Sequence, residues 1–461
     1  MLTRDKVAGL FDRVRKFSLT DETELIVNGG KSSLTRFANN VITQNVSEEN
    51  YVLSVRVNLD GKTARATTNK FDDDSVRRVV ESATALARVQ EKDPDLLPMP
   101  DASAYDAKAS AVARTFLETA EIGPHERAEA VGQMVEVANK YSLTTAGIYA
   151  TSQAVEAVFN SRGLAAYYSQ TSAEVSVTML AEDSSGWQKA NYPDVRNLDP
   201  VALAETAARK AKDSAHPKEL SPGKYTVILE PAAVLDLAGF MFWDWGGQAI
   251  LDERSFLNNR IGERLFGENI TIVDDVYHPL QTGAPFDGEG VARQRVPLVE
   301  NGVVKRLVFA RSTAKKIKHS DYAEKVGPIE ATGHGFPLPN EIGEIPANIV
   351  IGGPAGRSRT VDQMVSSTER GILVTRLWYI REVDPYEKLL TGMTRDGTFL
   401  VENGKVQHGL LNFRFNESMI HMFSNVLETG EPVRASGEES FDMVVPAMKV
   451  RDFNFTEVTK F

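Results

Sequence analysis

Cysteine is absent from this chain of 461 residues. Its absence excludes disulfides, thiolate nucleophiles and every metal site with a cysteine ligand. Long apolar runs are missing too, because no stretch reaches the roughly 18 residues that a membrane helix needs. Positive charge is in deficit: the formal net charge is −11, which disfavours non-specific attraction to nucleic acid and to anionic membranes. We therefore expect neither nucleic acid nor a membrane among the partners.

The N-terminus has none of the features of a secretory signal. Its first residues, MLTRDKVAGLFDRVRKF, carry a charge every few positions and lack both an apolar core and a small-residue cleavage site. Hydrophobic residues make up 42% of the chain and charged residues 25%, as in ordinary soluble proteins. We expect a cytoplasmic protein, long enough for two domains or one large one.

The first part of the chain alternates between helical and strand patterns. Apolar residues recur at helical spacing over about 4–18, at Val7, Leu10, Phe11, Val14 and Phe17. Strand-like stretches follow up to residue 69, with Asp60-Gly61 as a hairpin turn. A second amphipathic helix is predicted over 72–89, where a run of aspartates can cap its first turn.

The same pattern then begins again, which predicts an internal duplication. A helix at about 125–141, strands at about 144–191 and a helix opened by Asp199-Pro200 repeat the earlier order. A shift of 122 positions matches Phe37 to Phe159, Ser54 to Ser176 and Val55 to Val177. We infer two helix–strands–helix repeats packed as one α+β domain, residues 1–218. Chance similarity between amphipathic strands is the alternative.

The rest of the chain is rich in turns and strands. The segment HPKELSPGKYTVILEP, 216–231, has two prolines and a glycine before a new apolar strand, which favours a domain boundary near 217–224. Two VENG tetrapeptides, at 299–302 and 401–404, place Asn-Gly between strand-like runs and predict hairpins. We therefore expect a β-rich C-terminal domain over 223–461, and an α+β fold class for the whole chain.

One acidic group is the strongest candidate site. Five potential ligands fall within residues 274–289: Asp274, Asp275, His278, Asp287 and Glu289. Hard cations such as magnesium or calcium bind carboxylates of this kind. The alternative is that Asp274 and Asp275 end a strand and that GAPFDGEG forms a turn. The other histidines are scattered, and no order of histidine, carboxylate and hydroxyl residues recommends a serine hydrolase.

Several longer motifs resemble a known family. The stretches SFLNNRIGERLFGENITIVDD (255–275) and FDGEGVARQRVPLVENGVVKRLVFARSTAKK (286–316) are similar to the hallmark region of the TldD/PmbA family. Two N-terminal stretches, SLTRFANNVITQNV (33–46) and SVRVNLDGKTARATTN (54–69), resemble the first part of the same family. Its members were once called modulators of DNA gyrase and are classed as metallopeptidases.

The resemblance also implies what this chain lacks. In that family the TldD subunit carries a helical His-Glu-x-x-x-His pair and a cysteine that hold zinc, whereas its partner, TldE or PmbA, lacks them. The place for the helix motif is 227–248, which contains no histidine. Catalytic zinc needs three protein ligands and an open position. We therefore assign no catalytic residue, cofactor or metal to this chain and expect zinc in a partner subunit.

The resemblance implies a peptidase complex that encloses unfolded peptides. We expect this chain to be the non-catalytic, TldE/PmbA-type subunit, paired with a zinc-bearing TldD-type homologue or with itself. Asp274, Asp275, His278, Asp287 and Glu289 are then a structural motif or part of a peptide groove. Two alternatives stay open: an active metallohydrolase that uses the 274–289 group, and a homodimeric peptide-binding scaffold without protease activity. The sequence does not reveal the natural peptide.

Overall fold

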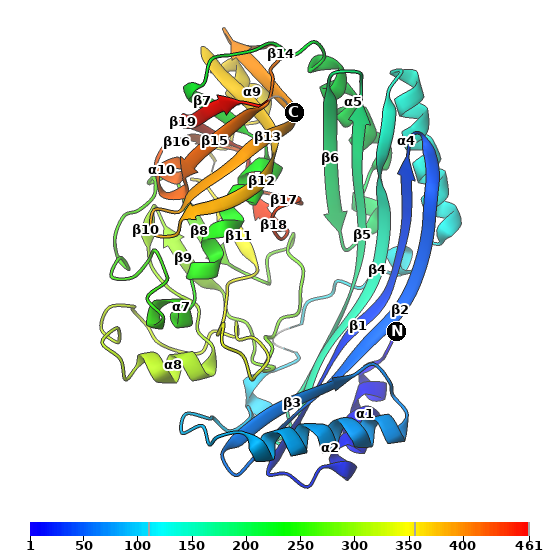
Figure 1. Ribbon diagram of the computed structural model, residues 1–461, viewed down its shortest axis with the longest axis vertical. Coiled ribbons are helices and arrows are strands. Elements are labelled where there is room, and N and C mark those ends of the chain that lie inside the picture. Colours follow the sequence, from blue (N-terminus) through cyan, green and yellow to red (C-terminus); the bar gives the residue numbers. More distant parts are fainter. Residues whose placement is uncertain (109–110, 355, 460–461) are drawn as a thin grey trace.

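The molecule has two halves, a long curved sheet with its helices and a β-rich half beside it (Figure 1). This computed structural model describes residues 1–108, 111–354 and 356–459. The last two residues of the predicted C-terminal domain, 460 and 461, lie outside that range. Within it, no helix is both long enough and apolar enough to span a membrane. The predicted α+β class, with a β-rich C-terminal half, is confirmed.

The N-terminal half is built on one six-stranded sheet in the order β3-β2-β1-β4-β5-β6, with every neighbouring pair antiparallel. The strands are β1 (Glu22–Ala38), β2 (Val41–Leu59), β3 (Lys62–Thr68), β4 (Thr144–Asn160), β5 (Ala165–Leu180) and β6 (Ser185–Tyr192). The main helices are α1 (Arg4–Phe17), α2 (Asp73–Val89), α4 (Pro124–Lys140) and α5 (Pro200–Asp213), with a short α3 (Leu117–Ala120). Two copies of helix, three strands and helix are confirmed.

The duplication is visible in the strand register. β1 and β4 have bounds that coincide after a shift of 122 positions. The two strands pair with each other, and Lys31 lies opposite Gln153, its own counterpart in the second repeat. A local two-fold axis therefore passes through this pair, and the two repeats form one continuous sheet.

Local chemistry explains why the helices start where the sequence predicts. The Asp72 carboxylate accepts a hydrogen bond from the N–H of Ser75 and caps α2. Asp199 accepts from Ala202 in the same way, and Pro200, which has no N–H to satisfy, occupies the first position of α5.

Side chains alternate between the two faces of a strand. The four long helices all lie on the same one of these faces. At one end α1 and α2 pack on Leu25 and Val27, and at the other α4 and α5 pack around Phe37. The opposite face, hereafter the inner face, carries Ile26, which packs against Phe286 of the C-terminal half. No helix of the described residues lies over the middle of the inner face.

The C-terminal half contains two mixed sheets. One runs β12-β7-β19-β15-β13-β14, with β16 paired to β19, and the other runs β10-β9-β8-β11-β18-β17. The bounds are β7 (Gly223–Leu229), β8 (Thr271–Asp274), β9 (Val296–Glu300), β10 (Val303–Val304), β11 (Ile349–Gly352), β12 (Arg370–Asp384), β13 (Leu389–Glu402), β14 (Lys405–Gly409), β15 (Phe413–Ser418), β16 (Val426–Thr429), β17 (Val433–Ala435), β18 (Met443–Val445) and β19 (Met448–Val458). Both predicted VENG hairpins are confirmed, since Asn301-Gly302 and Asn403-Gly404 connect paired strands with positive φ angles.

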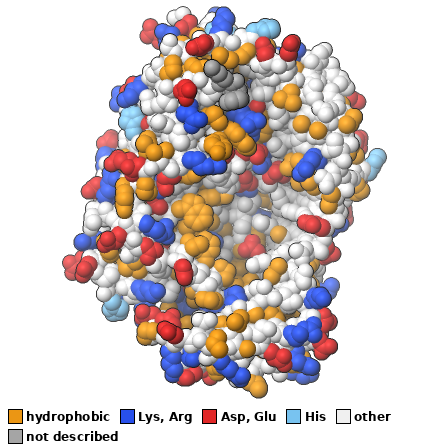
Figure 2. All heavy atoms as spheres, in the orientation of Figure 1, with side chains coloured by type: hydrophobic (Ala, Val, Ile, Leu, Met, Phe, Trp, Pro, Cys, Tyr) orange, Lys and Arg blue, Asp and Glu red, His pale blue; other side chains and the backbone are white. Residues whose placement is uncertain are grey.

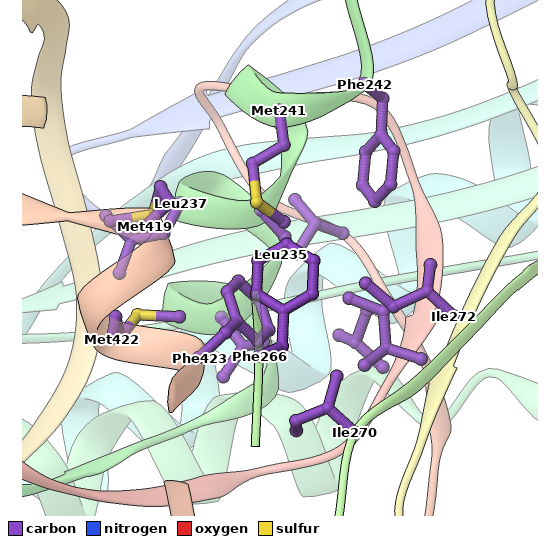
Figure 3. Close-up of a cluster of buried hydrophobic side chains, with 14 of the residues drawn as sticks. Leu235, Leu237, Met241, Phe242, Phe266, Ile270, Ile272, Met419, Met422 and Phe423 are labelled. Carbon is purple, nitrogen blue, oxygen red and sulfur yellow. The ribbon is translucent and has the colours of Figure 1, made fainter. Parts of the chain in front are cut away.

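Short helices pack between these sheets around one apolar core. They are α6 (Pro231–Ala238), the 3₁₀ helix η3 (Gly239–Asp244), α7 (Gly247–Leu251), α8 (Arg311–Ile317) and α10 (Met419–Ser424). Another short helix, α9 (Val361–Ser366), packs in a separate cluster with Ile228 and Leu373. Figure 3 shows side chains from α6, α10 and the 266–272 segment meeting in this core, among them Leu237, Phe266 and Phe423. Each such side chain contributes about 1.5–3 kcal/mol when fully buried.

Candidate functional site

A polar groove lies on the inner face of the N-terminal sheet, where no helix covers it. Its volume is about 510 Å³. The lining residues are mostly small or polar and come from five strands: Ser32, Ser33, Leu34, Arg36, Gln44, Val46, Glu48, Ala150, Thr151, Ser152, Ser172, Glu174 and Asn191. Figure 2 shows the surface hollowed between the two halves of the molecule.

The end of β17 and the loop after it, residues 434–442 of the C-terminal half (hereafter the 434–442 loop), border the β6 side of this groove. The Lys189 ammonium of β6 donates to the Gly437 carbonyl at 3.1 Å. The Arg434 guanidinium donates to the Asn191 side-chain oxygen at 3.2 Å, and Asn191 itself lines the groove. On its β6 side the groove is therefore bounded by a loop of the C-terminal half that is hydrogen-bonded to the N-terminal sheet.

Behind this loop lies α6, the helix in the segment where the family resemblance places the zinc motif. The predicted helical segment 227–248 is divided among the end of β7, α6, η3 and the start of α7. The only ionisable side chain of α6, Asp236, is fully buried. Its Oδ1 accepts from the N–H groups of Glu438 and Glu439 at 3.2 and 3.0 Å. Its Oδ2 has no hydrogen-bond partner among the described residues.

The environment of Asp236 favours its neutral form. Burial raises the pKa of this carboxyl to about 7, although the two backbone hydrogen bonds work in the opposite direction. Gly437 lies so close that a Cβ atom there would be 2.1 Å from Oδ1 of Asp236. The helix and the loop are thus fitted to each other, with no imidazole between them.

Asp274, the first residue of the predicted acidic group, ends β8 as the strand-ending interpretation expects. It is fully buried. Its Oδ1 lies 2.9 Å from Nε2 of His334, and its Oδ2 accepts from the N–H groups of Ala347 and Asn348. Burial works to raise the pKa of Asp274, but the charge and hydrogen bond of His334 outweigh it, so the pKa is lowered. The carboxylate holds three chain segments together.

Asp275 and His278 point elsewhere and belong to a turn at the surface. Asp275 accepts from the N–H of Tyr277 and forms an ion pair with Arg295 at 3.3 Å. Nδ1 of His278 accepts from the N–H of Leu280, and partial burial lowers the pKa of the imidazole. These contacts are local, and neither side chain reaches Asp274 or Asp287.

Asp287 and Glu289 lie in the predicted GAPFDGEG turn, and both are buried. The Asp287 carboxylate accepts from the N–H groups of Glu289, Val291 and Gly335, so its acceptor positions are occupied by backbone. Burial raises the pKa of Asp287. Burial, helped by the nearby charge of Asp287, raises the pKa of Glu289 to about 7.

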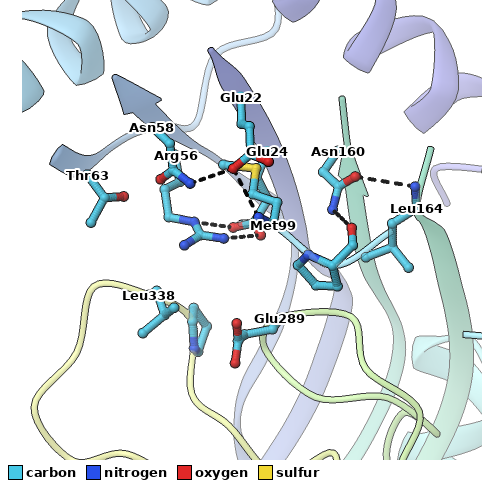
Figure 4. A network of polar contacts seen from close by, with 12 residues as sticks. Glu22, Glu24, Arg56, Asn58, Thr63, Met99, Asn160, Leu164, Glu289 and Leu338 are labelled. Carbon is cyan, nitrogen blue, oxygen red and sulfur yellow. Dashed lines mark hydrogen bonds and ion pairs between the residues drawn. The ribbon is translucent and has the colours of Figure 1, made fainter. Parts of the chain in front are cut away.

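Glu289 also faces a charged cluster on the N-terminal sheet. Figure 4 shows it on a loop beneath the buried pair of Arg56 and Glu24. The Glu289 carboxylate lies 3.3 Å from Arg311, while its Oε1 has no hydrogen-bond partner among the described residues. Arg65 forms a second ion pair with Glu24 at 2.7 Å and donates to the Leu338 carbonyl. This cluster fixes the 286–290 turn against the N-terminal half.

A second, smaller cavity of about 200 Å³ lies between the inner face and the C-terminal half. Asp287 and His334 line it, together with Arg293 and, from β4, Glu156. The structure therefore brings Asp274, through His334, and Asp287 to one place. It leaves Asp275 and His278 at the surface.

None of these carboxylates forms a metal centre in the described part of the chain. No three histidine, aspartate or glutamate side chains there converge as ligands. Asp274 and Asp287 already bind backbone N–H groups, which compete with a cation for the same oxygens. The contacts favour the structural interpretation of this group over the magnesium or calcium site.

Sequence reasoning missed four residues of this region. His334 was among the scattered histidines, and Glu156 stood in no motif. Arg293 lay in the family-like stretch 286–316 and Asp236 in the segment 227–248, and neither was predicted as a site residue. A useful signal for Asp236 was its place as a lone charge in an otherwise apolar helix. The other three become neighbours only through contacts between distant segments.

Models of protein domains match most of the chain. The PmbA/TldA metallopeptidase C-terminal domain matches residues 222–457. Domain 1 of the same family matches 23–87, and its central domain matches 92–215.

Individual relatives agree with these models. The metalloprotease PmbA of Escherichia coli O157:H7 is 22% identical over 414 residues, which are 86% of this chain and 85% of that protein. An uncharacterized protein of Methanocaldococcus jannaschii, MJ0231, is 26% identical over 263 residues. That match spans 56% of this chain and 60% of the relative, less than two thirds of its length. The crystal structure of TldE from Thermococcus kodakarensis has the same fold, with a TM-score of 0.85, 20% identity and coverage of 98% and 99% of the two chains.

Proposed function

The chain belongs to the TldD/PmbA family of metallopeptidase-related proteins, and we propose that it is the non-catalytic, TldE/PmbA-type subunit of a complex that cleaves unfolded peptides. One observation carries the proposal. Where the resemblance places the zinc-binding helix, α6 offers a single carboxylate, Asp236, which binds the backbone of the 434–442 loop. Catalytic zinc needs three protein ligands, so zinc would come with a homologous partner chain.

The groove supports a role in holding peptides. Its floor carries serine, asparagine and glutamine side chains, and few large apolar ones. Hydroxyl and amide groups can donate to and accept from any peptide backbone, whatever its side chains. Such a floor suits an extended, unfolded substrate better than a folded one with a fixed surface.

A reconstitution experiment tests this proposal. The chain is purified alone and together with a zinc-bearing homologue that carries the His-Glu-x-x-x-His pair, and cleavage of an unfolded protein substrate is measured. We expect cleavage only from the mixture. Ser152→Trp should obstruct the groove and raise KM, whereas Ser82→Trp, on the exposed side of α2, should leave it unchanged.

Two results would replace the proposal. Cleavage by the chain alone, with one zinc bound, would establish the active hydrolase. If the homologue is equally active without this chain, the peptide-binding scaffold becomes the favoured function. We also propose that the chain folds as two units, 1–218 and 223–461, which limited proteolysis between residues 214 and 223 would reveal.

A further inference from the structure

The cavity of about 200 Å³ continues the groove along the same two strands. Asn28 of β1 lines the cavity, and Ser32, four residues further on the same face, lines the groove. Four residues of extended chain span about 13 Å. Between them lie Gly30 and, directly opposite on β4, Ala154. Glycine and alanine have the two smallest side chains, so no large side chain on these two strands separates the groove from the cavity.

Two ionisable groups in the cavity, Arg293 and the half-buried Glu156 of β4, make no hydrogen bond or ion pair in the described part of the chain. Burial raises the pKa of Glu156, and the charge of Arg293 lowers it in part. Nε and Nη1 of Arg293 are shut off from solvent, which leaves Nη2 as the nitrogen that a ligand in the cavity can reach. Leaving such groups unpaired in a protein interior is unfavourable. The other polar groups of the cavity are engaged: Asp287 by three backbone N–H groups and His334 by Thr332 and Asp274.

The remaining walls are largely apolar. They consist of Ile26 and Val158 from the sheet and Phe286, Phe336, Pro337 and Ile345 from the C-terminal half. The volume corresponds to roughly seven water molecules at about 30 Å³ each, which is room for one residue the size of leucine. A cavity with an apolar wall, an unpaired carboxylate and an unpaired guanidinium is complementary to a dipolar ligand with an apolar side chain.

We propose that this cavity binds one apolar amino-acid residue through its free α-amino group. The ammonium group donates to the Glu156 carboxylate. The carbonyl or carboxylate oxygen of the same residue accepts from Nη2 of Arg293, and the side chain lies against Ile26, Val158 and Phe286. The ligand is either the N-terminal residue of a peptide that continues into the groove or a free amino acid. Only the peptide source rests on the proposed function.

The test compares ligands on the isolated chain by titration calorimetry. The probes are L-leucine, the tetrapeptide Leu-Gly-Gly-Gly and the N-acetylated form of each. We expect saturable binding of a free-amine ligand that weakens at least about tenfold on acetylation, because a charge-assisted hydrogen bond is lost. Tighter binding of the tetrapeptide than of leucine identifies a peptide terminus, and the reverse order identifies a free amino acid.

Variants assign the two contacts. Glu156→Gln should remove the difference between free and acetylated ligands, and Arg293→Gln should weaken both forms by at least about tenfold. Arg295→Gln, two residues from Arg293 but paired with Asp275 and not among the residues that line the cavity, is the matched control and should bind as the parent chain does. Equal binding of free and acetylated ligands, or no binding at millimolar concentration, would overturn the proposal, and neither result needs a variant to fold. The binding test uses the isolated chain, without zinc or a partner. A failed peptidase reconstitution would therefore not change its result.

Discussion

Replacing Asp236 by asparagine should stabilise the protein above neutral pH and leave it nearly unchanged below about pH 4. Asp236 is fully buried in α6 and its pKa is raised to about 7 from 3.8, because burial disfavours the charged form. Asparagine keeps an oxygen for the N–H groups of Glu438 and Glu439. Its amide takes the place of the O–H that neutral aspartic acid carries, and it cannot ionise.

The magnitude follows from proton linkage. Between about pH 4 and pH 7 the folded protein keeps a proton at Asp236 that the unfolded chain has released, so stability falls as the pH rises. Each unit of pKa difference corresponds to about 1.4 kcal/mol. The shift from 3.8 to about 7 therefore corresponds to about 4 kcal/mol. This penalty is absent below about pH 4, complete above about pH 7, and removed in the variant.

Urea unfolding at several pH values, followed by circular dichroism, measures this difference. Asp274→Asn provides a control of opposite sign, because the pKa of Asp274 is lowered in the fold by His334 despite burial. Its ionised form stabilises the protein above the unfolded pKa, and that contribution is lost as the pH falls. The gap between Asp274→Asn and the parent chain should close toward acid, whereas the gap for Asp236→Asn should open toward base. A gap for Asp236→Asn that stays constant with pH would refute the argument.

Three further predictions concern the acidic group, the metal and one turn. Asp274→Asn should lower the free energy of unfolding at neutral pH by about 3–5 kcal/mol, since it leaves His334 without its buried partner. Asp275→Asn, at the surface, should lower it by only about 1 kcal/mol. Equal losses in urea unfolding would contradict the burial argument. The chain purified alone should contain no stoichiometric zinc in elemental analysis, and about one tightly bound zinc per chain would show a metal site of another kind. Gly290→Ala should lower thermal stability by about 1–3 kcal/mol, because φ is +80° and the new Cβ would lie 2.4 Å from Leu164. The control Gly262→Ala has φ +90° and open space around it. It should lower stability only by the backbone strain of about 1 kcal/mol.

Features set by neighbouring residues were predictable from the sequence. Asp72 and Asp199 cap helices where the sequence places them, and the Asn-Gly pairs at 301–302 and 403–404 form hairpins. Each depends on a few consecutive residues whose backbone preferences and hydrogen bonds are local. The duplication was predictable for a related reason, since the same local signals recur in the same order.

The site was less predictable, because its contacts join distant segments. Spacing suggested that Asp274, Asp275, His278, Asp287 and Glu289 act together, yet Asp275 and His278 turn toward the surface. The partner of Asp274 is His334, and Glu156 meets the same cavity as Arg293 from the other half of the molecule. No periodic pattern records such pairings. A functional role for the five residues, the domain boundaries and the cytoplasmic location stay predictions.

The groove itself follows from the duplication and from what breaks its symmetry. Each repeat supplies two helices to one end of the same face, so the sheet around Lys31 and Gln153 has its inner face free of helices. If the C-terminal half covered the inner face symmetrically, counterparts would be equally buried. Ile26 is buried against Phe286, whereas Ile148, its counterpart 122 positions later, is only half-buried. A single C-terminal half thus closes one end of a two-fold surface and leaves the middle open, which turns a symmetric sheet into a directional channel with one closed end.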